Sequence, residues 1–285
     1  MEIFDKLTKI NNCSLALGFF DGVHTGHRKV IKSIQNINDR KTAVITFNKR
    51  PFSSDKYLIT REKRTKLISD LGIDYMFELD FTPELAQTSA QDYLKMLYDN
   101  FHPQVIATGF NHTFGSNKSG TPELLTEYQS IYNYKYIKVP PQTMDGEIIS
   151  SSRIREFLSA GNIISANKML GYAFSIKGRV IHGNHIGHTI GFPTANIKYP
   201  DSIVKIPFGA YSATINGMKS VVNFGKKPTI GANLEPVVEA HILNFDKNIY
   251  NTDIEIKFIK KIRDEKKFNS LEELKEQINK DIKEC

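Results

Sequence analysis

The chain has 285 residues, enough for about two domains, and its 40% hydrophobic and 24% charged residues exclude a disordered or collagen-like protein. The net charge of +7 divides into +3 for residues 1–170 and +4 for residues 171–285, so it marks no single polyanion-binding segment. No apolar run approaches the roughly 18–20 residues that span a bilayer, and the N-terminus lacks a secretory signal. Two cysteines are too few for a disulfide framework, which favours a reducing compartment. We therefore expect a cytoplasmic protein without a membrane partner.

The first 170 residues alternate between short apolar runs and helical patterns. The apolar runs predict strands at Ser14–Phe20, Thr42–Phe47, Tyr75–Phe81, Val105–Phe110 and Tyr134–Val139. Helices are predicted between them at His27–Ile37, Glu62–Leu71, Ala90–Tyr98 and Pro122–Tyr132, with N-caps at Thr60, Ser89 and Thr121. This alternation indicates an α/β domain with a Rossmann-like parallel sheet, whose ligands bind at the carboxyl ends of the strands.

After a helical stretch over Ser151–Leu170, the pattern changes at Gly171. Alternating runs over 175–182, 209–215, 219–225, 237–245 and 252–259 predict strands with no helix between them. Asn216-Gly217 indicates a hairpin, and Ser270 to Glu273 is a capping box that begins a last helix. We therefore expect domains at 1–170 and 171–285, the second a small antiparallel β-barrel with a closing helix.

The string GFFDGVHTGH follows the first predicted strand and precedes a helix. Glycines let the backbone approach a ligand, and the helix start offers free N–H groups to phosphate oxygens. Two histidines three residues apart are able to stabilise charge on an attacked phosphate; one histidine alone would be better explained as a turn residue. The candidate residues are Gly18, Phe19, Asp21, Gly22, His24, Gly26 and His27.

Two further segments are candidates for the same site. Residues 149–155, ISSSRIR, begin a helix with hydroxyls followed by Arg153 and Arg155, which suit phosphate binding; a serine-capped helix with solvated arginines is equally consistent. Ser152 belongs to this cluster. Residues 109–115 follow the fourth strand and present Asn111 at the same sheet edge. Taken alone, this last segment is a weak signal.

The second half carries its own glycine-rich segment. Residues 178–183 and 187–196 contain Gly178, Gly187 and Gly191 and end in Pro193-Thr194-Ala195-Asn196. Such a segment is able to cover phosphates, and Thr194 and Asn196 supply oxygen ligands of the kind that Mg²⁺ takes. Glu239 lies in a predicted strand at what we expect to be an inward position, as a candidate general base; an outward or salt-bridged glutamate is the simpler reading without context.

Together, GFFDGVHTGH, GFNHTFG and ISSSRIR resemble the adenylyltransferase module of the prokaryotic bifunctional riboflavin kinase/FAD synthetase family. GFPTAN, with NFGKKPT and VEAHILNF, resembles its riboflavin kinase module. The resemblance implies that His24 and His27 stabilise ATP phosphates while AMP is transferred to FMN, giving FAD. It also implies that Thr194 and Asn196 bind Mg²⁺ and ATP phosphate, and that Glu239 activates the 5′-hydroxyl of riboflavin.

The chain departs from the family pattern at four places. Lys49-Arg50-Pro51 stands where Pro-His-Pro is usual, His112 replaces an aromatic residue, His188 replaces an arginine, and Asp246–Asn251 replaces an acidic turn that ends in glycine. Asn251 is still able to adopt a positive φ. The last two departures fall on the kinase module.

Three hypotheses follow for the function. The first is an enzyme that makes FMN in its second domain and FAD in its first. The second is a monofunctional FAD synthetase whose barrel serves as a scaffold or flavin-binding module. The third is a basic nucleic-acid-binding regulator, which would need a basic face with interleaved aromatic residues. The motifs favour the first, with small-molecule substrates, no nucleic acid partner and no indication of an oligomer.

Overall fold

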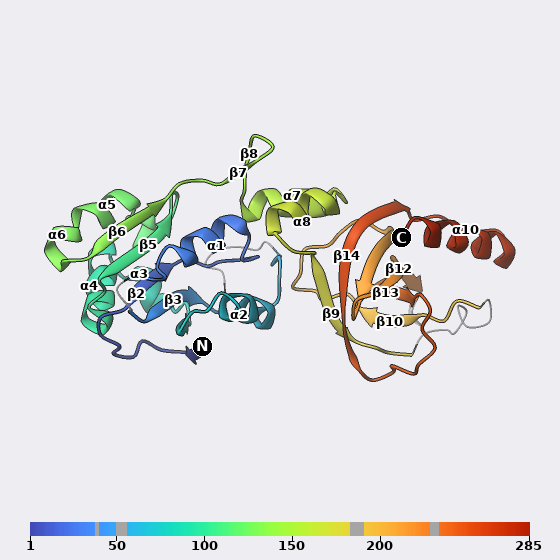
Figure 1. The fold of residues 1–285 in the computed structure, drawn as a ribbon, viewed down its shortest axis with the longest axis horizontal. Helices are drawn as coiled ribbons and strands as arrows, with labels where there is room; N and C mark the ends of the chain where they lie inside the picture. The colour runs from blue at the N-terminus through green and yellow to red at the C-terminus, as the bar shows by residue number, and fades with distance from the viewer. Residues whose placement is uncertain (38–39, 50–55, 183–190, 229–233) are drawn as a thin grey trace. The chain divides into compact units, whose positions relative to one another are not determined.

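The computed structural model describes residues 1–37, 40–49, 56–182, 191–228 and 234–285. The chain divides into two compact units, residues 1–55 with 60–151 and residues 56–59 with 152–285. Each unit has its own sheet, which is parallel in the first and antiparallel in the second (Figure 1). The predicted fold class is therefore confirmed.

The first unit has a six-stranded parallel sheet in the order β1-β4-β3-β2-β5-β6, with helices on both faces (Figure 1). Its strands are β1 (Glu2–Phe4), β2 (Ser14–Leu17), β3 (Thr42–Phe47), β4 (Tyr75–Leu79), β5 (Val105–Gly109) and β6 (Lys135–Val139). Its helices are α1 (Thr25–Lys32), α2 (Arg61–Ser69), α3 (Pro83–Gln87), α4 (Ala90–Phe101), α5 (Pro122–Glu127) and α6 (Gln129–Tyr132). A hairpin of β7 (Thr143–Met144) and β8 (Glu147–Ile148) follows β6.

The predicted elements of this unit are found with shifted bounds. β1 was not predicted, because three residues carry no periodicity. The predicted N-caps are confirmed, since the side chains of Thr60, Ser89 and Thr121 each accept a hydrogen bond from an amide three residues on. The helix expected to begin at His27 instead begins at Thr25, with His24 as its N-cap.

From residue 152 the second unit continues with two helices, α7 (Ser151–Ser159), whose first residue belongs to the first unit, and α8 (Ile163–Leu170). The expectation of one helical stretch over 151–170 is wrong, because Gly161 has φ +79° and Asn162 caps a new helix. The Asn162 side chain accepts from the amide of Ser165. α8 ends at Gly171, which has φ +75°, as a helix C-terminus favours.

The barrel of the second unit has the strand order β10-β13-β12-β11-β14-β9. Its strands are β9 (Ser175–Arg179), β10 (Ala195–Lys198), β11 (Gly209–Ile215), β12 (Met218–Pro228), β13 (Leu234–Ile242) and β14 (Asp253–Asp264), followed by α10 (Leu271–Lys283). A bridge between Ile181 and Asn196 brings the two edge strands together, so the sheet is nearly closed. Asn216 and Gly217 have φ +51° and +81° in the predicted β11–β12 hairpin.

Candidate active sites

The histidine loop lies where the strand order of the parallel sheet reverses. From β2 the chain proceeds through β3 to β4, and then crosses to β5 on the other side of β2. Ligands of open parallel sheets bind in the crevice at such a point, beyond the carboxyl ends of the strands. GFFDGVHTGH follows β2, and the segment with Asn111 follows β5. The fold therefore brings these two predicted segments to one edge of the sheet.

His24 and His27 form a close pair at the start of α1. Their rings stack with centroids 3.5 Å apart and planes 19° apart. The backbone amide of His27 donates to Nδ1 of His24 over 3.2 Å, so His24 carries its proton on Nε2 when neutral. An Nε2–H group is thereby left as a donor at the N-terminus of a helix, where anions are favoured.

Both imidazoles are held neutral. Burial lowers the pKa of His24, which is 4% exposed, from 6.5 to about 4. Burial, and then the neighbouring His24, lowers the pKa of His27 well below 6.5. Nδ1 of His27 is shielded from solvent and has no hydrogen-bond partner. At neutral pH the pair therefore consists of two uncharged rings, which are able to donate hydrogen bonds but carry no fixed charge.

Gly26 lets the His24 ring lie close to the backbone of α1. A Cβ atom at this position would lie 3.2 Å from both Cε1 and Nδ1 of His24, closer than most side chains tolerate. The loop before it has an unusual backbone, since Phe20 and Val23 have φ +55° and +37° and Gly22 has φ +85°. A positive φ at a β-branched valine is rare and costs free energy, which the buried surroundings must offset.

Contacts from elsewhere in the first unit fix this loop. The hydroxyl of Ser151, the last residue of the first unit, donates to the Asp21 carbonyl of the histidine loop over 2.8 Å. Arg64 of α2 donates to the Phe19 carbonyl over 3.1 Å and pairs with the buried Glu78 of β4 over 2.5 Å. Removal of either partner of a buried ion pair is strongly destabilising, because the other charge is then buried without a counter-charge.

Sequence reasoning missed Arg64 and Glu78. Glu78 had a detectable signal, since it is a carboxylate between the apolar residues Phe77 and Leu79 of a predicted strand, and it is 3% exposed in the sheet. Nothing in REKRTK distinguishes Arg64 from its charged neighbours, because only the fold shows which face of α2 is buried.

The remaining predicted residues of the first site are distributed over both units. Asn111 is exposed after β5, and its neighbour His112 stacks on Phe114 with centroids 5.9 Å apart. Ser152, Arg153 and Arg155 belong to the second unit. Arg153 pairs with Glu156 over 2.7 Å, and Nε of Arg155 donates to the Lys56 carbonyl over 2.8 Å.

In the barrel, strand register places the candidate kinase residues side by side. Asn196 of β10 lies directly opposite Glu239 of β13, so their side chains share one face of the sheet. Glu239 is half-buried, whereas its strand neighbours Val238 and Ala240 are fully buried on the other face. The expectation that Glu239 points into the barrel is therefore wrong, because the period of two turns it away from the core.

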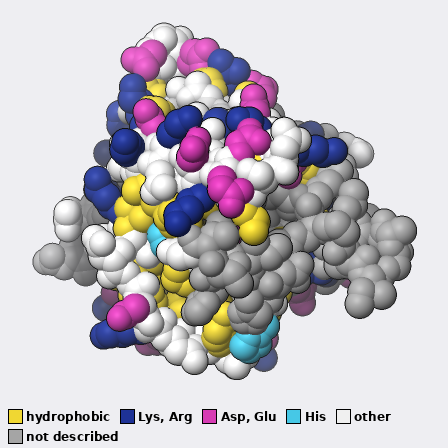
Figure 2. Space-filling model, turned by 90° about the vertical axis from the view of Figure 1, so that its right-hand side faces the viewer, with side chains coloured by type: hydrophobic (Ala, Val, Ile, Leu, Met, Phe, Trp, Pro, Cys, Tyr) yellow, Lys and Arg dark blue, Asp and Glu magenta, His cyan; other side chains and the backbone are white. Residues whose placement is uncertain are grey.

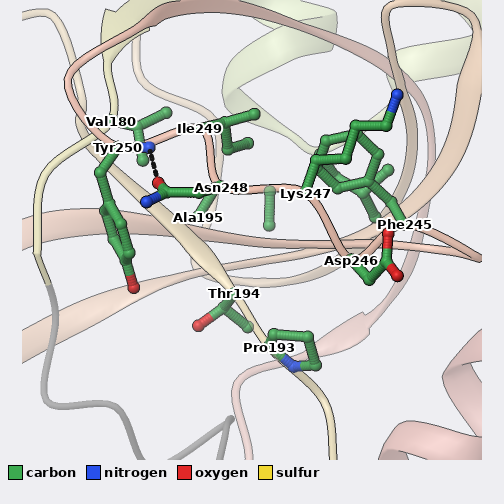
Figure 3. Close-up of a pocket in the computed structure, with 12 residues that line it drawn as sticks. Val180, Pro193, Thr194, Ala195, Phe245, Asp246, Lys247, Asn248, Ile249 and Tyr250 are labelled. Carbon is green, nitrogen blue, oxygen red and sulfur yellow. Dashed lines mark hydrogen bonds between the residues drawn. The ribbon is translucent and has the colours of Figure 1, made fainter.

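A pocket of about 360 Å³ opens beside the end of β10, a size within the usual range for ligand sites. Pro193 and Thr194 line it on one side and the turn Asp246–Tyr250 on the other (Figure 3). In this turn the Asn248 side chain accepts from the Tyr250 amide over 2.9 Å, and the Tyr250 ring stacks on His182 at 4.1 Å. Asn251, at the end of this turn, has φ +63°, as expected.

The predicted glycines of the barrel differ in their surroundings. A Cβ atom at Gly178 would lie 3.0 Å from Cβ of Ile197, so this glycine allows the close approach of β9 and β10. Gly191 is exposed with φ +85°, and nothing lies near its would-be Cβ. Nδ1 of His241 donates to the Pro193 carbonyl over 2.9 Å.

Four residues named in the sequence analysis lie outside the described residues, namely Gly187, His188, Arg50 and Pro51.

On the face that Figure 2 shows, acidic and basic side chains are intermixed, and neither sign of charge forms a continuous patch. Among the helices of the described residues, none combines the length and the apolar character that crossing a membrane requires.

Comparison with known proteins identifies both halves. Residues 6–153 match the FAD synthetase family model, and residues 170–285 match the riboflavin kinase model. A bifunctional riboflavin kinase/FMN adenylyltransferase from Buchnera aphidicola is 36% identical, covering 97% of this chain and 94% of the relative. The protein of that name from Listeria monocytogenes is 34% identical, covering 97% and 92%.

A solved structure from Streptococcus pneumoniae, described as a macrolide-efflux protein, matches with a TM-score of 0.89 and 28% identity. The match covers 99% of this chain and 97% of that one. With its two family models, its near full-length relatives and its two sheets, the chain belongs to the family of bifunctional riboflavin kinase/FMN adenylyltransferases.

Proposed function

We propose that this protein makes FAD from riboflavin in two ATP-dependent steps. Residues 171–285 transfer the γ-phosphoryl group of ATP to riboflavin, giving FMN and ADP, and residues 1–170 transfer AMP from a second ATP to FMN, giving FAD and pyrophosphate. The observation that carries the proposal is that each half matches its own family model and has its own cluster of polar side chains. This favours two activities over a synthetase with an idle barrel.

In the adenylyl transfer, a phosphate oxygen of FMN attacks the α-phosphorus of ATP, and the bond to the pyrophosphate oxygen breaks. Negative charge grows on the α-phosphate oxygens and the leaving pyrophosphate. The N–H groups of His24 and His27 and the amides at the start of α1 donate to these oxygens from a fixed position, so no reorganisation is needed as the charge develops. We assign ATP binding to Gly18, Phe19, Asp21, Gly22, Gly26, Asn111, Ser152, Arg153 and Arg155.

In the phosphoryl transfer, Glu239 accepts the proton of the riboflavin 5′-hydroxyl as its oxygen attacks the γ-phosphorus of ATP, and ADP leaves. A half-buried carboxylate opposite Asn196 suits this role because it is partly sheltered from water yet reachable by substrate. We assign ATP and flavin binding in this half to Gly178, Gly187, Gly191, Pro193, Thr194 and Asn196.

Mg²⁺ suits the donor set of the barrel. The described residues contain no group of three His, Cys, Asp or Glu side chains able to hold a metal on their own. Asn196 lies opposite Glu239, and Thr194 lines the neighbouring pocket two residues before it; both side chains offer an oxygen atom. Mg²⁺ is commonly held by a few protein oxygens together with nucleotide phosphates and water. Thr194 and Asn196 are therefore the residues that would hold it, and the ion would neutralise phosphate charge.

Product analysis tests the proposal. Purified protein with ATP and Mg²⁺ is incubated with riboflavin in one reaction and with FMN in another. We expect FMN and then FAD from the first, and FAD with pyrophosphate from the second. FAD from FMN without FMN from riboflavin would favour the monofunctional alternative, and no FAD from FMN would refute the adenylyl transfer. The same assays on cell fractions test the predicted cytoplasmic location.

A further inference from the structure

A row of polar side chains crosses three neighbouring strands of the barrel. Glu239 of β13 lies opposite Asn196 of β10 on one side and opposite Asn223 of β12 on the other. Residues that face each other across antiparallel strands share a face and have Cβ atoms about 4.5–5.5 Å apart. Asn196, Glu239 and Asn223 therefore form one row, with the proposed general base at its centre.

Asn223 is the member of this row that the proposed mechanism does not use. It is half-buried between Val222 and Phe224, both 0% exposed on the opposite face. Within the described part of the chain, its amide forms no hydrogen bond with another side chain. A polar amide in an apolar strand, partly withdrawn from water, is costly unless it has a partner.

A glycine next to Asn223 lets the Glu265 carboxylate lie close to β12. A Cβ atom at Gly225, two residues along β12, would lie 2.6 Å from Oε1 of Glu265 and 3.6 Å from Nδ2 of Asn223. A side chain at 225 would displace the Glu265 carboxylate, whereas its Cβ would only make an ordinary contact with the Asn223 amide. The polar surface around Glu239 thus extends along β12 through Asn223 towards Glu265.

The terminal helix lies on this same face. Asn223 is opposite Ala210 of β11, and Ala210 is opposite Arg263 of β14, so Arg263 continues the row. The guanidinium group of Arg263 donates to both carboxylate oxygens of Asp281 in α10, from Nε over 3.0 Å and from Nη2 over 2.8 Å. Asp281 is 2% exposed. This bidentate pair anchors α10 at the Arg263 end of the row.

We propose that Asn223 is a substrate-binding residue of the kinase site, whose amide hydrogen-bonds a secondary hydroxyl of the flavin's polyol chain next to the hydroxyl that Glu239 activates. The inference rests on the proposed kinase function. Hydroxyl groups both donate and accept, and an amide side chain offers two N–H donors and a carbonyl acceptor to match them. Because Asn223 and Glu239 are cross-strand neighbours, adjacent carbons of one chain reach both side chains.

The test compares two flavins with Asn223→Ala. One is riboflavin; the other carries a 5-hydroxypentyl chain, which keeps the terminal hydroxyl and lacks the secondary ones. We expect the variant to bind riboflavin about tenfold more weakly in a fluorescence titration, with a matching loss in kcat/KM, as for one neutral hydrogen bond. Affinity and kcat/KM for the hydroxypentyl flavin stay unchanged. Lys219→Ala, an exposed change on the same strand, serves as the control.

Equal losses for the two flavins would overturn the proposal, because Asn223 would then act through Glu239 and not on the secondary hydroxyls. No loss for riboflavin would overturn it as well. If the unaltered protein binds riboflavin and does not phosphorylate it, the kinase function fails, while the binding titration still decides the role of Asn223.

Discussion

The two candidate sites are built in different ways. The histidine pair comes from one contiguous loop, held by strained backbone and by a glycine that only just clears the His24 ring. The Asn196–Glu239 pair comes from the middle of two strands about forty residues apart and depends on their register alone. The first site is thus preformed by local geometry and the second by long-range pairing. If the two sites are independent, each substitution below changes one activity and leaves the other unaltered.

The largest effect is expected from Glu239→Gln. The amide is nearly isosteric with the carboxylate but cannot accept the substrate proton, so riboflavin phosphorylation should fall by about 10²–10⁴-fold. FAD formation from FMN should be unchanged. Steady-state kinetics of both reactions on the same preparation measure this, with the exposed Glu276→Gln on α10 as control. An unaltered kinase rate would show that Glu239 is a structural strand residue.

A reciprocal loss is expected from His27→Ala. Removing one preorganised donor from a site of developing charge typically costs about 10²–10³-fold, here in the conversion of FMN to FAD. The kinase rate should remain. His102→Asn is the matched control, because this exposed histidine at the end of α4 has φ +39°, a conformation that asparagine tolerates. Loss of both activities together would contradict two separate sites.

Gly26→Ala separates the geometry of the first site from its stability. Alanine is favoured over glycine by up to about 1 kcal/mol in a helix interior and by less in the first turn, where Gly26 lies, so α1 should not be destabilised. Its Cβ would nevertheless press on the His24 ring from 3.2 Å and displace it by a few tenths of an ångström. We expect about a tenfold fall in FAD formation with an unchanged or raised Tm. Lys32→Ala, exposed in the same helix, should leave the rate unaltered.

The difference between a contiguous loop site and a site formed by strand register explains how much of each site could be predicted from the sequence. GFFDGVHTGH is local, so its place after a buried strand predicted both the fold and the loop site. β10 was missed because GFPTANIK mixes a glycine-proline turn with four strand residues. The orientation of Glu239 and the partnership with Asn223 follow from register, which a single sequence does not specify. Arg64 was missed for a similar reason, since its partner Glu78 comes from another strand.

The smallest effect concerns His112, the residue that replaces an aromatic one in the loop after β5. Its Nε2 is shielded without a hydrogen-bond partner, and burial lowers its pKa from 6.5 to about 4. At a pH between these two pKa values, His112 binds a proton in the unfolded chain but not in the folded protein. The free energy of unfolding therefore falls as the pH falls from about 6.5 towards 4. His112→Phe keeps the stacking on Phe114 and removes the unpaired nitrogen. We expect it to raise the free energy of unfolding by about 1 kcal/mol at pH 8. The gain should be larger at about pH 5, as measured by urea denaturation at both values. A gain independent of pH would show that the His112 ring titrates normally in the folded protein, and a loss at both would show that its nitrogen has a partner.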